Sequence, residues 1–353
     1  MTGKLILEDG LEMSGISFGS TTPISGEVVF STGMMGYPES LTDPSYKGQI
    51  LVLTYPLIGN YGVPDKLLWE SEHIQVSGLI VSNYIDTPSH FQSKKTLAAW
   101  FRDEKIPLLE IKDTRLLTQH IREKGSLLGK ITFGKDIPFY DPNNENLVAK
   151  VSTKKVTILE SNSSRPRSNS KTIVLIDCGT KKNIQRALVK IGATVITIPW
   201  DYDIFSSKDK LDFDGIIISN GPGNPKFVQK TIDILRIAME KEIPILGICL
   251  GHQLLTLAAG GNTKKLKYGH RSQNQPCMMH DSSRCYITTQ NHGFAVSKIP
   301  DNFIPWFTNA NDQTNEGIMH KKLPFMSVQF HPEATPGPMD AEWIFDYFLK
   351  KIK

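Results

Sequence analysis

The side chains best suited to nucleophilic chemistry lie in the second half of the chain, around one cysteine. Residues 247–251 read Gly-Ile-Cys-Leu-Gly after a short apolar run, and residues 252–260 have the pattern of a helix that ends at a glycine. A strand, a tight turn and a helix in this order form an elbow that presents a nucleophile at the carboxyl edge of a sheet. The helix dipole favours a thiolate there, so the pattern predicts Cys249 as a nucleophile.

A histidine and a glutamate further along the chain supply the other groups that this chemistry needs. His331 directly follows the apolar run 325–330, and Glu333 comes shortly after it. A carboxylate so placed can orient the imidazole ring and stabilise its protonated form, while the ring takes and returns a proton. The sequence therefore predicts a catalytic triad of Cys249, His331 and Glu333.

The other three cysteines, Cys178, Cys277 and Cys285, have no such setting. We interpret them as small buried or ordinary surface residues. No Cys-x-x-Cys pair occurs, which argues against a structural zinc site or a disulfide framework and indicates a reducing compartment.

Composition restricts the class of protein. A chain of 353 residues is long enough for two domains, and 39% hydrophobic and 22% charged residues are typical of a soluble globular protein. The net charge of +4 is small and no dense basic stripe occurs, so we expect no nucleic-acid partner. We also expect no signal or transit peptide and no membrane span, because residues 4–10 lack their patterns and no apolar run is long enough.

The second half alternates between strand and helix patterns. The predicted strands cover residues 172–177, 194–198 and 215–219, with a further apolar run at 243–246 before the elbow, and the predicted helices cover residues 181–191 and 226–241. Such alternation predicts a mostly parallel sheet flanked by helices, with ligands beyond the carboxyl ends of the strands. The loop 220–225 and the elbow at Cys249 both belong to that edge.

The first half has short strand patterns at residues 4–8, 27–31, 49–54 and 78–83, and helical patterns only at residues 93–104 and 114–124. It indicates a smaller, strand-rich α+β domain. Residues 161–171 contain no apolar side chain, which is typical of a linker. We therefore predict an α/β protein with an N-terminal domain at 1–150, a linker at 151–171 and a catalytic domain at 172–353.

Several shorter patterns carry less weight. Residues 125–130 resemble a phosphate-binding loop but have one residue too few between the glycines, and Lys226 stands where a dinucleotide fingerprint after residues 221–223 would need glycine. His252 and His292 are interpreted as structural, because His331 already has a carboxylate partner. Residues 291–294 could form a simple turn.

Four motifs of the second half resemble the class I (triad) glutamine amidotransferase domain. They are residues 247–251, Asn-Gly-Pro-Gly at 220–223, Gln-Asn-His-Gly-Phe at 290–294 and Gln-Phe-His-Pro-Glu at 329–333. The first half is similar to the N-terminal domain of the carbamoyl-phosphate synthase small-chain family, through residues 26–30, 33–39, 41–46 and 53–60. Ser272 and Gln275 depart from the pattern expected of the family, so the resemblance does not predict the conformation of the loop 269–276.

The resemblance implies which residues act on glutamine. Cys249, His331 and Glu333 would be the triad, and the backbone N–H groups of Leu250 and Gly223 would stabilise the oxyanion. The residues expected to contact L-glutamine are Ser45, Gly221, Gly223, Leu250, Gln253, Asn291, Gly293 and Phe294. No metal site is implied. Ser45 could instead be an ordinary turn serine.

The resemblance also implies a division of labour. This chain would hydrolyse L-glutamine through a thioester, without a cofactor of its own. It would pass ammonia to a large chain that binds ATP, Mg²⁺ and bicarbonate and makes carbamoyl phosphate for arginine and pyrimidine biosynthesis. A bacterial cytoplasm or a plastid stroma is the expected location.

Three alternatives remain open. An anthranilate- or guanylate-type amidotransferase would share residues 172–353 but not residues 1–150. A γ-glutamyl hydrolase or cysteine peptidase of similar fold would act alone and be secreted. A non-catalytic scaffold would tolerate the loss of Cys249, His331 or Glu333, yet all three are present.

Overall fold

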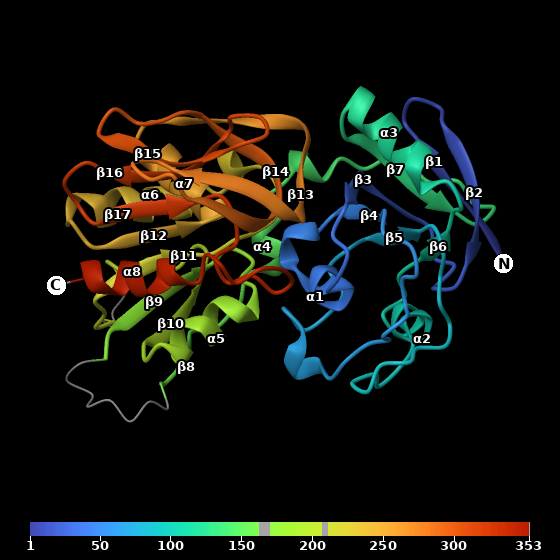
Figure 1. Cartoon of the computed structure of the whole chain (residues 1–353), viewed down its shortest axis with the longest axis horizontal. Helices are drawn as coiled ribbons and strands as arrows, with labels where there is room; N and C mark the ends of the chain where they lie inside the picture. The colour runs from blue at the N-terminus through green and yellow to red at the C-terminus, as the bar shows by residue number, and fades with distance from the viewer. Residues whose placement is uncertain (162–169, 207–210, 353) are drawn as a thin grey trace. The chain divides into compact units, whose positions relative to one another are not determined.

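The structure is a computed structural model that describes residues 1–161, 170–206 and 211–352. The chain forms two compact units (Figure 1). Unit 1 comprises Met1–Asn144 with Lys267–Ser272, and unit 2 comprises Glu145–Leu266 with Gln273–Lys353. In the part of the chain that is described, no helix is both long and apolar enough to cross a membrane.

Unit 1 is built on a closed barrel of seven strands. In barrel order these are β1 (Thr2–Leu7), β2 (Glu12–Ser17), β6 (Leu108–Glu110), β5 (Gly78–Val81), β4 (Gln49–Leu53), β3 (Ile24–Ser31) and β7 (Leu127–Thr132). Strands β3, β4, β5 and β6 run parallel, and β1 pairs antiparallel with β7 to close the barrel. Closure leaves no strand edge unpaired in the ring.

Three α-helices accompany the barrel: α1 (Tyr37–Thr42), α2 (Leu97–Asp103) and α3 (Thr114–Lys124). The start of α2 is fixed by Thr96, whose hydroxyl accepts from the Ala99 N–H at 3.2 Å. Asp113 caps α3 in the same way, and α3 ends at Gly125, which adopts φ +104°. The predicted helices at 93–104 and 114–124 are therefore present, the first of them shortened at its start.

Unit 2 is built on a ten-stranded sheet. Its order is β14 (Cys285–Lys298), β13 (Asn262–Met279), β15 (Phe303–Asn309), β16 (Asn315–His320), β17 (Phe325–Val328), β12 (Ile245–Ile248), β11 (Gly215–Ile218), β9 (Thr172–Asp177), β10 (Thr194–Pro199) and β8 (Thr157–Leu159). The five strands from β17 to β10 are mutually parallel. The α/β architecture predicted for this half is confirmed.

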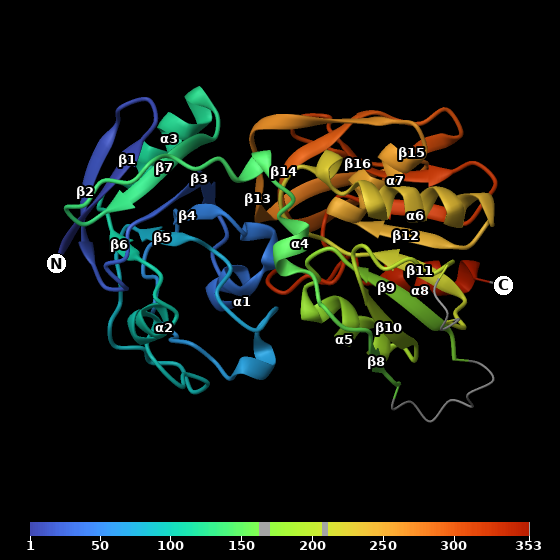
Figure 2. The ribbon, with the colours of Figure 1, turned by 180° about the vertical axis from the view of Figure 1, so that it is seen from behind.

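Helices cover both faces of this sheet (Figures 1 and 2). Helices α5 (Lys182–Lys190) and α8 (Trp343–Lys351) pack with one set of strand residues, and α6 (Gln229–Glu240) and α7 (Leu250–Ala258) pack with the alternate set. On β9, for example, Leu175 faces the first pair of helices and Val174 the second. A sheet buried on both faces explains the nearly continuous apolar runs of its strands.

Two segments differ from the sequence-based expectation. Within the predicted linker at 151–171, Thr157–Leu159 forms β8, which pairs antiparallel with β10, and the short helix α4 (Val148–Val151) also belongs to unit 2. Residues 162–169 of that linker lie outside the described residues. The alternative that residues 291–294 form a simple turn is wrong, because these residues lie inside β14.

Candidate active site

The elbow that carries Cys249 joins β12 directly to α7. Cys249 has φ 55° and ψ −102°, a conformation that non-glycine residues rarely adopt, and it is buried. Its N–H donates to the Val328 carbonyl at 2.8 Å, which ties the turn to β17. A Cβ added to Gly251 would lie 2.3 Å from the Ile218 carbonyl oxygen, so only glycine lets α7 approach the sheet this closely. The local packing therefore fixes where the thiol points.

Two backbone N–H groups of unit 2, those of Leu250 and Gly223, are available as donors. Neither Leu250 N–H nor Gly223 N–H donates a hydrogen bond to any residue that the structure describes. Leu250 is the first residue of α7, and Gly223 adopts φ +83°. The Cys249 Sγ lies 3.7 Å from the Asn291 carbonyl oxygen on β14. A donor at a helix start, such as Leu250 N–H, is suited to hold a developing negative charge.

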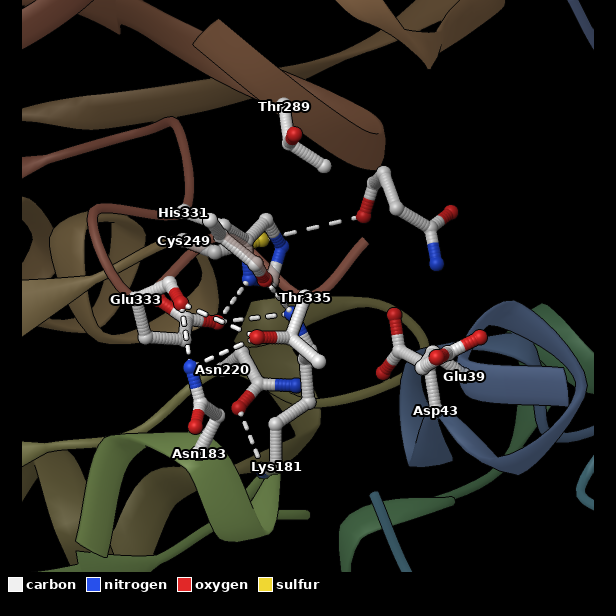
Figure 3. Close-up of polar contacts among 12 residues, drawn as sticks. Glu39, Asp43, Lys181, Asn183, Asn220, Cys249, Thr289, His331, Glu333 and Thr335 are labelled. Carbon is white, nitrogen blue, oxygen red and sulfur yellow. Dashed lines mark hydrogen bonds and ion pairs between the residues drawn. The ribbon is translucent and has the colours of Figure 1, made fainter. Parts of the chain in front are cut away.

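His331 and Glu333 form a short hydrogen bond, with 2.6 Å between Nδ1 and Oε1 (Figure 3). Both side chains are buried. The His331 N–H donates to the Thr289 carbonyl at 2.9 Å, which anchors the turn to β14. Figure 3 shows the sulfur of Cys249 beside the imidazole ring. Because Nδ1 is hydrogen-bonded to the carboxylate, Nε2 is the ring nitrogen that can exchange a proton with the thiol.

The charges of the site favour an ionised histidine and an ionised glutamate. Burial by itself would lower the pKa of His331, but Glu333 and Cys249 outweigh it and raise the pKa to about 10. Burial would raise the pKa of Glu333, but Lys181 and His331 outweigh it and lower the pKa to about 2. The ring can therefore hold a proton at neutral pH while the carboxylate stays charged.

Lys181 is a member of this cluster that the sequence did not reveal. Its side chain is almost completely buried, and its Nζ lies 3.1 Å from Glu333 Oε1 and also donates to the Ala334 carbonyl. Its N–H donates to Asn220 Oδ1 at 3.0 Å. The available signal was its place just after β9, at the carboxyl edge of the sheet. A lysine that opens a helix is ordinarily read as a solvated residue.

The backbone after Glu333 is also held in an unusual conformation. Ala334 and Thr335 have φ 56° and 48°. Asn183 Nδ2 donates to the Glu333 carbonyl and, at 2.6 Å, to Thr335 Oγ1. Thr289 Oγ1 donates to the Pro336 carbonyl at 2.8 Å. These bonds, visible in part in Figure 3, fix the direction of the Glu333 side chain.

Unit 2 brings several of the predicted glutamine contacts to the elbow. Gln253 Nε2 donates to the Phe294 carbonyl at 2.9 Å, Asn291 contacts the thiol through its carbonyl, and a Cβ on Gly221 would lie 2.8 Å from Leu250 Cδ2. The predicted contacts in this unit are Gly221, Gly223, Leu250, Gln253, Asn291, Gly293 and Phe294. Their roles stay predictions.

Ser45 belongs to unit 1. It lies in a 3₁₀ turn, Pro44–Tyr46, and its N–H donates to Asp43 Oδ1 at 2.9 Å, so the serine side chain is not needed to cap the turn. That its hydroxyl reaches glutamine stays a prediction.

The two other histidines considered from the sequence lie near the elbow. His252 is a buried residue of α7 with Nδ1 2.9 Å from Ser327 Oγ, and burial lowers its pKa to about 3. His292 bonds through Nδ1 to the Phe294 carbonyl at 2.8 Å and through Nε2 to Gln290 Oε1 at 3.1 Å. Each ring thus holds neighbouring strand residues in place.

Comparison with known proteins identifies the family of the chain. Residues 174–351 match the family described as glutamine amidotransferase class-I, which gives the class of unit 2. Residues 5–131 match the CPSase domain of the carbamoyl-phosphate synthase small chain. The carbamoyl phosphate synthase arginine-specific small chain of Chaetomium globosum is 46% identical over 99% of this chain and 78% of its own length. The chain belongs to the carbamoyl-phosphate synthase small-chain family.

Other relatives are much longer. The mitochondrial carbamoyl-phosphate synthase (ammonia) of Homo sapiens is 46% identical over the whole of this chain. The chain spans only 16% to 24% of the length of that protein and of the related multifunctional and mitochondrial proteins. Among solved structures, a GMP synthase protein of Thermoplasma acidophilum is similar at 25% identity and a TM-score of 0.46, over 52% of this chain and 94% of that one.

Proposed function

We propose that this chain is the glutaminase subunit of a carbamoyl-phosphate synthase. It hydrolyses the side-chain amide of L-glutamine and delivers the ammonia to a large ATP-dependent chain. The observation that carries the proposal is the buried arrangement of Cys249 at the elbow and the His331–Glu333 pair beside it, with 2.6 Å between Nδ1 and Oε1. Family membership supports the same activity.

In the first half of the reaction, the Cys249 thiolate attacks the amide carbon, and its proton is held by His331. The carbon–sulfur bond forms and the carbonyl oxygen becomes an oxyanion, which accepts hydrogen bonds from Leu250 N–H and Gly223 N–H. His331 then protonates the departing nitrogen, and the carbon–nitrogen bond breaks. The products are ammonia and a γ-glutamyl thioester on Cys249.

In the second half, neutral His331 takes a proton from water, and the resulting hydroxide attacks the thioester. The carbon–sulfur bond breaks, glutamate leaves, and the thiolate–imidazolium pair is restored. Glu333 keeps the ring oriented and stabilises its charged form in both halves. Lys181 holds Glu333 in turn, at 3.1 Å.

The bound glutamine contacts Gly221, Gly223, Leu250, Gln253, Asn291, Gly293 and Phe294 of unit 2 and Ser45 of unit 1. Residues 1–150 form the domain that completes the site and docks the partner, residues 151–171 connect it, and residues 172–353 carry the catalysis.

ATP, Mg²⁺ and bicarbonate act on the large chain, and the carbamoyl phosphate supplies arginine and pyrimidine biosynthesis. Ammonia must stay unprotonated to act as a nucleophile, so it travels to the partner through a passage closed to water. The location we propose is a bacterial cytoplasm or a plastid stroma.

The test compares two nitrogen sources in the complex of this chain with its large partner. We expect Cys249→Ser to abolish carbamoyl phosphate synthesis from glutamine and to leave synthesis from ammonium salts intact. Equal loss of both activities would contradict the division of labour.

Three relatives are named for ammonia, so a second candidate is a unit that hydrolyses no glutamine. The wild-type complex would then use only ammonium salts. Product analysis with the partner also separates the proposal from an anthranilate- or guanylate-type enzyme.

A further inference from the structure

Two buried side-chain amides pack together behind the elbow, Gln253 on α7 and Gln329 just after β17. They are 2% and 0% exposed. Gln253 Nε2 donates to Gln329 Oε1 at 3.0 Å and to the Phe294 carbonyl at 2.9 Å. The backbone N–H of Gln329 donates to the Glu316 carbonyl at 2.9 Å, which holds Gln329 in the sheet.

These contacts allow the Gln253 amide only one orientation. An amide nitrogen has two hydrogens, and both are used here. The Phe294 carbonyl can only accept, so a rotated amide would place two oxygens against each other, and Gln329 must then also present its oxygen. Consequently the Gln253 Oε1 is the free end, and it accepts no hydrogen bond from any residue in the described part of the chain.

This free oxygen belongs to the site. Gln253 lies four residues after Cys249, one helical turn along the same side of α7. Its partner Phe294 lies on β14, close in sequence to Asn291, whose carbonyl is 3.7 Å from the Cys249 Sγ. Gln329 itself immediately precedes the turn that carries His331. A hydrogen-bond acceptor of fixed orientation therefore belongs to the residue one helical turn after the nucleophile.

We propose that Gln329 is a positioning residue that selects substrates with an α-ammonium group by locking Gln253 with its acceptor oxygen toward the bound amino acid. The inference rests on the proposed function. Of the two donors on glutamine, the amide nitrogen must leave toward His331, so the α-ammonium is the donor that remains for Gln253 Oε1. A carboxylate at the same place would be repelled by this oxygen.

The test compares L-glutamine with its des-amino analogue 4-carbamoylbutanoate, which has the same amide and carboxylate but no ammonium. The variants Gln329→Met and Gln329→Glu are assayed in the complex with the large partner. Methionine keeps the volume and removes the acceptor, whereas glutamate keeps an acceptor oxygen.

For Gln329→Met we expect kcat/KM for L-glutamine to fall by about tenfold to a hundredfold, the size of a lost hydrogen bond to a charged group. The fall should be in KM, with kcat within about threefold, because the ammonium does not take part in bond breaking. Activity on 4-carbamoylbutanoate should not change. Gln329→Glu should recover most of the preference for L-glutamine.

The matched control is Ser327→Ala. Ser327 Oγ is hydrogen-bonded to His252 Nδ1 at 2.9 Å, so this variant breaks a hydrogen bond between α7 and β17, two residues before Gln329, without touching Gln253. This variant should leave the ratio of kcat/KM for L-glutamine to kcat/KM for 4-carbamoylbutanoate unchanged. Gln329→Met acting equally on both substrates, or not at all, would overturn the proposal.

A double variant covers the case in which Gln329→Met does not fold. Gln253→Met with Gln329→Met replaces both polar partners by apolar ones, which leaves fewer buried atoms unpaired. Its preference for L-glutamine should equal that of Gln253→Met alone, and a further loss would contradict the coupling. A wild-type complex that hydrolyses neither amide would instead refute the proposed function before any variant is compared.

Discussion

Replacing Lys181 by methionine removes the buried cation that holds Glu333. Lys181 and Glu333 are 1% and 0% exposed, with 3.1 Å between Nζ and Oε1. The pKa of Glu333, lowered from 4.5 to about 2, corresponds to about 3 kcal/mol of stabilisation of the carboxylate. Breaking a buried pair leaves an uncompensated charge and costs about 3–5 kcal/mol. Because His331 remains beside Glu333, we expect a loss of about 2–4 kcal/mol.

The assay is thermal and chemical unfolding of wild type and Lys181→Met as a function of pH. At pH 7 we expect the melting temperature to fall by about 5–15 °C. The pKa of Glu333 is depressed in the folded state, so its contribution is complete above pH 4.5 and is lost as pH falls toward 2. The difference in free energy of unfolding between wild type and Lys181→Met should therefore become smaller below pH 4.5.

The matched control is Lys190→Met, at the other end of α5 from Lys181, which is the N-cap residue of that helix. Lys190 is 71% exposed at its side chain and lies 3.6 Å from Glu342, so this pair should contribute less than about 1 kcal/mol. The reasoning would be refuted if Lys181→Met lowered the free energy of unfolding by no more than Lys190→Met does. It would also be refuted if the loss caused by Lys181→Met grew as pH falls.

The remaining predictions concern catalysis and pH. Glu333→Gln should reduce kcat less than His331→Asn, because the carboxylate only orients the ring that carries the proton; single-turnover glutamine hydrolysis measures both. Ser45→Ala should raise KM for glutamine several-fold to about thirtyfold, with kcat and melting temperature nearly unchanged, and an unchanged KM would return Ser45 to the turn. The pKa of His331 is raised from 6.5 to about 10, so its contribution to stability is complete below pH 6.5 and is lost as pH rises toward 10. The free energy of unfolding of the wild type should therefore decrease between pH 6 and 10, and His331→Asn should lack this decrease.

The elements around the elbow were predictable because their apolar pattern is local. Strand β9 has the predicted bounds 172–177, and α6 begins and ends within the predicted 226–241. The three residues that the triad prediction named lie together, with His331 bonded to Glu333 and the sulfur of Cys249 beside the ring (Figure 3). In β9 and α6 the apolar residues follow the period of a strand or a helix that buries them against the core, and this period can be recognised in the sequence alone.

Long-range partners account for what was missed. Lys181 pairs with Glu333, far away in sequence, and nothing near it indicates that a lysine is buried there. Strand β13 is rich in charged and polar residues, so its hydrogen bonds to the neighbouring strands, rather than an apolar alternation, define it. Strand β8 has three residues, too few to show a period. The closure of the barrel by β1 and β7 likewise depends on pairing between distant segments.

The backbone at Cys249 has a consequence for the stability of the fold. With φ 55° and ψ −102°, this position would suit glycine better than any residue with a Cβ, and strain of this kind costs about 1–3 kcal/mol. A protein optimised only for stability would have no reason to place a cysteine there. The thiol is thus present at a cost to the stability of the fold. Cys249→Gly should give an inactive chain that unfolds at a higher temperature than the wild type.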